Sequence, residues 1–135
     1  MQCQTRLDWF TPSGGVLADL KTCDSLNRFE YDCLKYGYVL QMAYKRAVLS
    51  EAGGRKYHAY LVAVEKNPPY ATGVWMIETE TMAEAELYVR ATLKEYKTCL
   101  TDDVWPTRYE QTRLLCEKIG RAPIYRENDG KSVEN

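Results

Sequence analysis

An apolar run that follows a cluster of turn-forming residues is the feature that most constrains the fold of this chain. Residues 16–20 are apolar at every position except Asp19, and residues 11–15 before them are rich in Pro, Ser and Gly. Such a run is typical of a central strand covered on both faces, and the turn joins it to residues 6–10 as a hairpin. A carboxylate inside such a strand is costly to bury unless it is paired or bound to a metal. Asp19 is therefore the first candidate functional residue.

Charged side chains share one face of the predicted hairpin. A four-residue loop, residues 12–15, places Asp8 opposite Asp19, whereas a two-residue loop, residues 14–15, places Asp8 opposite Lys21. Because side chains alternate with period two, the three charges lie on one face in both registers. Two carboxylates beside a lysine can form a divalent-cation site that hydrolyses a phosphodiester. The same three side chains can also form a salt-bridged cluster without chemistry, and spacing alone does not separate the two interpretations.

Landmarks along the rest of the chain resemble a known family. In order, they are the segments RLDW, a turn, ADLKT, RF, YGY, QMAY, VEKNPPY and WP. Their order and spacing resemble the RecE or exonuclease VIII type of the PD-(D/E)XK nuclease superfamily, a relative of the phage lambda exonuclease, over residues 3–107.

The resemblance implies a role for each residue of the proposed site. Asp8, Asp19 and the backbone carbonyl of Leu20 would bind Mg²⁺ or Mn²⁺, and Lys21 would handle the attacking water. Gln41, on the following helix, matches a glutamine that the family also uses. The chemistry agrees, because a hard cation prefers oxygen ligands and lowers the pKa of bound water.

Two departures from the family pattern concern the completeness of the site. Family members usually carry a further acidic residue on a helix before the first strand, but only seven residues precede Asp8. They often have a tyrosine four residues after the glutamine, where this chain has Lys45, with Tyr44 one place earlier. On a helix Tyr44 and Lys45 both neighbour Gln41, so both are candidate substrate contacts, Lys45 through a phosphate. Alternatively, Tyr44 packs in the core and Lys45 is a solvated surface residue. We expect weak or absent cleavage by these residues alone.

The remaining pattern predicts an α/β fold, with a mixed central sheet of about four strands flanked by helices, as in restriction endonucleases. A helix-rich segment at 26–52 is interrupted near Gly37 and ended by two glycines. Strands follow at 56–66 and 71–77. A helix at 81–100 has Thr81 as its N-cap, because Glu84 follows three residues later. We expect one domain over residues 1–120 and a polar tail at 121–135.

Composition excludes several classes. The 135 residues carry a net charge of −1, which argues against a broad basic surface for nucleic acid. The five cysteines form no CxxC pair, so free thiols are expected rather than a zinc or iron–sulfur site. The lone histidine, His58, lies in a strand pattern and is taken as structural. No apolar run approaches the roughly 18 residues that span a bilayer, so the expected location is the cytoplasm of a bacterial host.

The first functional hypothesis is metal-dependent, exonuclease-like hydrolysis of DNA in phage-type recombination. The resemblance implies a ring-shaped homo-oligomer and a single-strand annealing protein as a partner. No membrane partner is expected, because the chain has no long apolar run. The alternative is a truncated, non-catalytic nuclease-fold module that binds DNA or a recombination partner. A second enzymatic alternative is an endonuclease with the same site, which would cut closed circular DNA.

Overall fold

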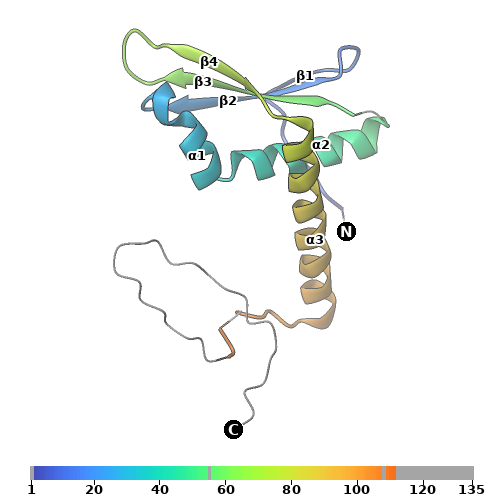
Figure 1. Cartoon of the computed structure of the whole chain (residues 1–135). Coiled ribbons are helices and arrows are strands. Elements are labelled where there is room, and N and C mark those ends of the chain that lie inside the picture. Colours follow the sequence, from blue (N-terminus) through green and yellow to red (C-terminus); the bar gives the residue numbers. More distant parts are fainter. Residues whose placement is uncertain (1, 55, 108, 112–135) are drawn as a thin grey trace. The chain divides into compact units, whose positions relative to one another are not determined.

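The computed structural model describes residues 2–54, 56–107 and 109–111 of the chain. Its sheet has four strands in the order β1-β2-β3-β4 (Figure 1). The strands are β1 (Trp9–Thr11), β2 (Val16–Cys23), β3 (His58–Glu65) and β4 (Thr72–Met76). The two central strands, β2 and β3, are parallel, and each edge strand is antiparallel to its neighbour. The predicted mixed α/β fold is confirmed.

The first hairpin has the longer of the two predicted loops. Trp9 pairs with Ala18 and Thr11 with Val16, so residues 12–15 form the loop. Gly15 has a φ of 64°, a left-handed conformation that glycine adopts without steric cost. The predicted start of the first strand at residue 6 is wrong, since β1 begins at Trp9. Immediately before it, the side chain of Asp8, rather than its main chain, bonds to β2.

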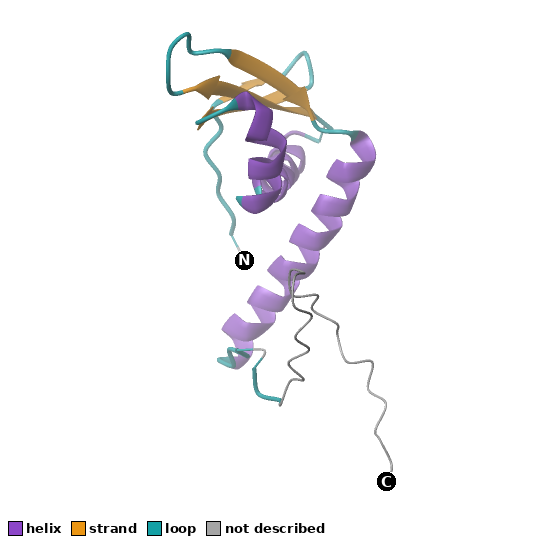
Figure 2. Ribbon diagram, turned by 60° about the vertical axis from the view of Figure 1, so that its left-hand side comes forward, coloured by secondary structure: helices purple, strands orange, loops and turns teal. Residues whose placement is uncertain are grey.

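The helices lie on one side of the sheet, as Figures 1 and 2 show. They are the short 3-10 turn η1 (Leu26–Arg28) and the α-helices α1 (Phe29–Lys35), α2 (Tyr38–Gly53) and α3 (Thr79–Asp102). The predicted interruption near Gly37 separates α1 from α2, and Gly54, with a φ of 64°, ends α2. The predicted cap at Thr81 is wrong. The Met82 amide donates to the Glu78 carbonyl, so the helix already begins at Thr79.

The core lies between the sheet and the helices. Its largest fully buried apolar side chains come from β2, β3 and all three α-helices: Leu17, Phe29, Met42, Leu61 and Met82. An ion pair of 2.6 Å between Arg46 Nε and Glu86 Oε1 links α2 to α3 beside this core. Within the described residues, no helix is long and apolar enough to cross a membrane.

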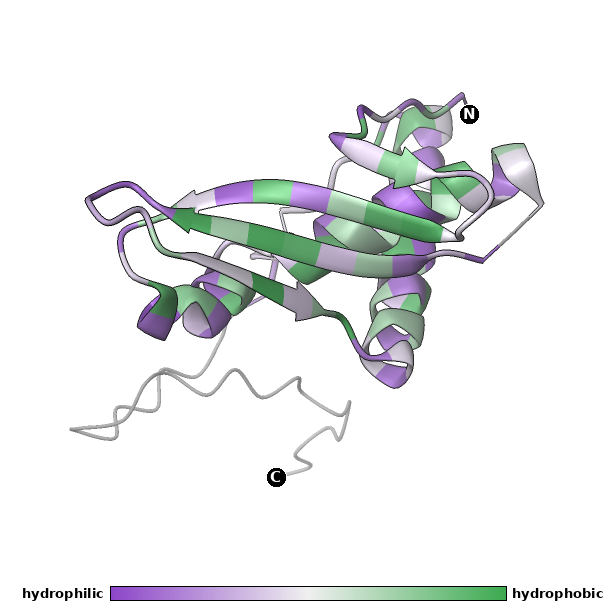
Figure 3. Cartoon of the chain, turned by 90° about the horizontal axis from the view of Figure 1, so that it is seen from above, coloured by the Kyte–Doolittle hydropathy of each residue, from purple (hydrophilic) through white to green (hydrophobic). Residues whose placement is uncertain are grey.

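The other face of the sheet is open in the part of the chain that the structure describes. Leu20 is 58% exposed and Val74 is 64% exposed. Figure 3, seen from above, shows apolar residues along β2 and β3 with no helix in front of them. The prediction that the central strand is covered on both faces is therefore wrong for the described residues. A continuous apolar run indicates that both faces of the strand are apolar, not that both faces are covered.

The described residues up to Asp103 form one compact unit, and the described residues from Val104 belong to a second. Within the described part of the second unit, the Thr107 hydroxyl donates a hydrogen bond of 2.8 Å to Glu110. The predicted tail at 121–135 and Cys116 lie outside the described residues. The cysteines that are described carry free thiols, as expected: Cys3, Cys23, Cys33 and Cys99.

Candidate active site

Asp19 lies at the centre of β2, on the face that the helices cover. Its side chain is only 2% exposed. Lys21 Nζ lies 2.6 Å from its Oδ2 atom, and Lys45 Nζ pairs with its Oδ1 atom. Lys21 reaches Asp19 along the same strand, because residues two apart share a face. Lys45 reaches it from α2, which packs on that face.

These contacts determine the charge state of Asp19. Burial by itself would raise the pKa of this carboxyl group. The two ammonium groups outweigh burial, through hydrogen bonding and Coulomb attraction, and hold the pKa of Asp19 below its ordinary value of 3.8. Asp19 is therefore a charged, fully compensated carboxylate inside the protein.

Lys21 has further partners besides Asp19. Its ammonium donates a hydrogen bond of 2.6 Å to Gln41 Oε1. It also lies 4.4 Å from the centroid of the Tyr38 ring, a favourable cation–π contact. Gln41 and Lys45 are one turn apart on α2, so both face β2. The structure thus brings the predicted residues Lys21 and Gln41 together next to Asp19.

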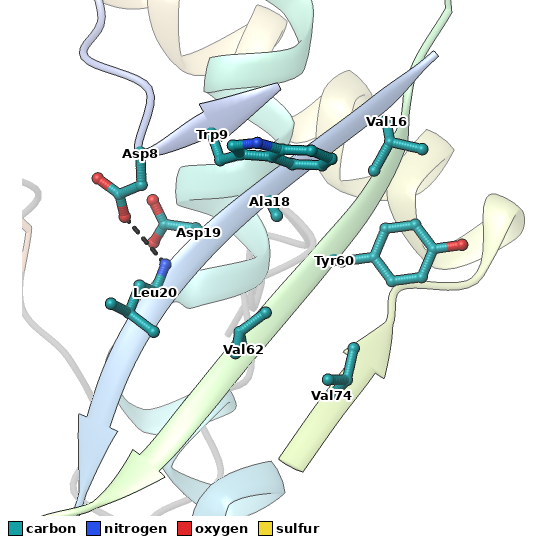
Figure 4. Close-up of a pocket in the computed structure, with 9 residues that line it drawn as sticks. All are labelled: Asp8, Trp9, Val16, Ala18, Asp19, Leu20, Tyr60, Val62 and Val74. Atoms are coloured by element: carbon teal, nitrogen blue, oxygen red, sulfur yellow. Dashed lines mark hydrogen bonds between the residues drawn. The ribbon is translucent and has the colours of Figure 1, made fainter. Parts of the chain in front are cut away.

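Asp8 approaches the same strand from the hairpin. Its Oδ2 atom accepts a hydrogen bond of 2.9 Å from the Leu20 amide. Figure 4 shows the carboxylates of Asp8 and Asp19 beside that amide. Both residues border a hollow of about 490 Å³ that otherwise lies over the apolar outer face of the sheet. Trp9 pairs with Ala18, so the observed register is the predicted one that places Asp8 opposite Asp19.

Tyr44 and Lys45 have different environments. The Tyr44 hydroxyl donates to the backbone carbonyl of Gln4 at 3.1 Å, away from the charged cluster of Asp19, Lys21 and Lys45. Burial raises the pKa of Tyr44. Lys45 is 8% exposed, so the alternative that it is a solvated surface residue is wrong. Its ion pair with Asp19 was not anticipated from the sequence. The available signal was its position one turn after Gln41, which places it on the helix face that covers β2.

The donors present suit a divalent cation. Asp8 and Asp19 offer carboxylate oxygens and Leu20 a nearby backbone carbonyl, the ligand types that Mg²⁺ and Mn²⁺ prefer. In the described part of the chain, no donor makes an aligned hydrogen bond to the buried Oδ2 atom of Asp19, although the Lys21 ammonium is close. No group of three or more His, Cys, Asp or Glu side chains converges there among the described residues. Two carboxylates would thus be the side-chain ligands.

Glu65, the acidic residue at the end of β3, is a further carboxylate to consider as a cation ligand. Its Oε1 atom accepts a hydrogen bond of 2.8 Å from the Leu26 amide. This contact ties the end of β3 to the start of η1, so Glu65 joins two elements of the fold and lies outside the charged cluster.

The comparison with protein families assigns the fold. A family model described as a PDDEXK-like domain of unknown function (DUF3799) matches residues 1–118. The chain belongs to this family, which confirms the resemblance to the PD-(D/E)XK nuclease superfamily. The comparison with curated proteins gives no match.

Proposed function

We propose that the protein hydrolyses phosphodiester bonds of DNA with Mg²⁺ or Mn²⁺, as an exonuclease of the RecE type. The observation that carries this proposal is the position of the Lys21 ammonium. It is held between the buried carboxylate of Asp19 and the amide of Gln41, with a second carboxylate, Asp8, bonded to the next backbone amide. A structural ion pair alone would not require this convergence of two carboxylates, a lysine and an amide.

Each residue has a distinct task in this proposal. Asp8, Asp19 and the Leu20 carbonyl would hold the cation, which when bound lowers the pKa of water and polarises the phosphate. Lys21 orients the attacking water and stabilises the negative charge that develops on the phosphate. Gln41 holds the Lys21 ammonium through Oε1, which leaves its amide nitrogen as a donor for a phosphate oxygen.

The biological setting follows from the family resemblance and is part of the proposal. A RecE-type nuclease acts in phage-type recombination, with a ring-shaped homo-oligomer and a single-strand annealing protein as the expected partners. The net charge of −1 is consistent with DNA contacts confined to the site rather than spread over a basic surface.

A second candidate function is a non-catalytic nuclease-fold module that binds DNA or a recombination partner. The observation that favours it is the full compensation of Asp19 by two lysines. A carboxylate paired in this way is stable without a cation, so the cluster could persist as a structural element of the fold.

A nuclease assay separates the two candidates. The purified protein is incubated with linear and closed circular duplexes in Mg²⁺, in Mn²⁺ and with a chelator. We expect slow digestion of the linear duplex that needs the cation and is lost in Asp19→Asn. The matched control is Asp24→Asn, whose exposed carboxylate pairs with Lys66 at the surface and should not affect digestion. Folded protein without cation-dependent cleavage would support the non-catalytic module, and cutting of the circle would indicate an endonuclease.

A further inference from the structure

The two lysines that pair with Asp19 are held very differently. Lys21 has three partners: Asp19, the Gln41 amide and the Tyr38 ring. Lys45, in contrast, has Asp19 as its only polar partner among the described residues. Moving Lys45 away from Asp19 therefore breaks one polar contact, whereas moving Lys21 away would disturb three.

The charges around Asp19 favour the departure of one ammonium group when a cation binds. The single carboxylate of Asp19 is paired with two ammonium groups, those of Lys21 and Lys45. A divalent cation placed at Asp19 would lie within a few ångströms of two positive charges. Like charges at that separation repel strongly inside a protein, where screening is weak. Binding of a cation is then favoured when one ammonium moves away.

We propose that Lys45 is an internal counter-ion that competes with a divalent cation for Oδ1 of Asp19. This inference rests on the cation site of the proposed function and adds a control element to it. Cation binding displaces Lys45 but leaves Lys21 in place on Gln41. The released ammonium lies one turn from Gln41 on the same helix face, where it can pair with a phosphate oxygen of the substrate.

Mn²⁺ titration by calorimetry tests the competition directly. Lys45→Met keeps a long apolar stem in the buried space but removes the charge, and Lys45→Gln is a second variant with a polar end. We expect each folded variant to bind Mn²⁺ about tenfold more tightly than the wild type, within the usual range for two coupled ligands. The matched control is Lys66→Met, whose ammonium pairs with Asp24 at the surface and should leave Mn²⁺ affinity unchanged.

Chemical labelling of the wild-type protein gives an independent readout that needs no variant. The acylation rate of Lys45 is measured by mass spectrometry with and without saturating Mn²⁺. We expect slow labelling without Mn²⁺, because Lys45 is buried on Asp19, and at least tenfold faster labelling with it. Lys97, an exposed residue of α3, provides the internal reference for any effect of Mn²⁺ on the reagent.

The outcomes separate this inference from the proposed nuclease. Unchanged or weaker Mn²⁺ affinity in the folded Lys45 variants overturns the competition, even if the wild type cleaves DNA. Absence of Mn²⁺ binding in every variant overturns it as well. If the variants bind Mn²⁺ more tightly but neither they nor the wild type cleave DNA, the competition is supported and the proposed nuclease function is overturned. If neither variant folds, the labelling rate of Lys45 in the wild type decides.

Discussion

The two faces of β2 contrast in an unusual way. The face toward the helices carries Leu17, Asp19 and Lys21, of which Asp19 is almost fully buried. The face away from the helices carries Val16, Ala18 and Leu20, and it is open in the described part of the chain. The two charged side chains therefore lie on the covered side, beside the buried Leu17, whereas the open side carries apolar side chains next to solvent. Folding alone favours the opposite arrangement.

This contrast shows where the cost of the site lies. Burying three charges between the sheet and α2 is tolerated because each has a partner of opposite sign. Asp19 is held from two sides, by Lys21 on its own strand and by Lys45 on α2. A surface cluster of the same residues would be stabilised less and oriented poorly. In the proposed function the covered face carries the site, and we expect the open face to contribute little to stability.

The largest effect on stability is expected when one member of the charged cluster is removed. Asp19→Ala leaves the buried ammonium of Lys45 without a counter-ion, so we expect a loss of about 3–5 kcal/mol in the free energy of unfolding. Urea denaturation measures it. The double variant Asp19→Leu with Lys45→Met replaces the pair by apolar groups and should recover most of the loss. A cost of Asp19→Ala below about 1 kcal/mol, typical of exposed pairs, would contradict the account.

A matched pair of substitutions on the same strand compares the faces directly. Leu17 is 1% exposed and Leu20 is 58% exposed, and the two residues lie on opposite faces of β2. Leu17→Ala should cost about 2–5 kcal/mol, because it leaves a cavity in the core. Leu20→Ala should cost less than about 1 kcal/mol, because its side chain stays largely in water. Equal costs, measured by urea denaturation, would mean that something covers the outer face in solution.

A smaller effect is expected from acid. The pKa of Asp19 is lower in the folded protein than in the unfolded chain, so the unfolded state binds more protons near that range. Its stabilising contribution is present above about pH 4 and is lost as the pH falls through the lower folded value. Urea denaturation between about pH 2 and pH 6 should show stability falling with acid. The slope should be smaller in Lys45→Met and smaller still in Asp19→Asn, and an identical slope in all three would exclude Asp19 as its source.

Much of the fold could be predicted because the signals are local. The turn residues before Val16 and the period-two alternation place Asp19 and Lys21 on one face, and both loop registers keep Asp8 there. The glycine at position 37 separates two helices because its positive φ ends one helical segment. The helix start at Thr79 was missed because a main-chain bond, rather than a side-chain cap, forms its first turn.

The contacts of Lys45 and Tyr44 and the exposure of β2 depend on how the elements pack, which local sequence patterns do not show. Lys45 meets Asp19 because of the way α2 lies across β2. Spacing within α2 places Lys45 on the same helix face as Gln41, but it does not show which residue of β2 that face meets. Tyr44 was weighed as a substrate contact, yet its hydroxyl bonds to the N-terminal segment at Gln4. The open face of β2 has the same kind of apolar residues as a covered one, so the sequence pattern does not distinguish them.

Lys21→Ala tests most directly the proposal that Asp19, Lys21 and their neighbours form a catalytic site. This substitution removes the ammonium between Asp19 and Gln41 but leaves the proposed cation ligands in place. Mn²⁺ binding by calorimetry and cleavage of linear duplex are measured on the same folded preparation, alongside the wild type. We predict that Mn²⁺ binding is retained and that cleavage falls at least ~100-fold, the low end for one general acid–base group. Normal cleavage by the variant would contradict this prediction and assign Lys21 to structural pairing alone.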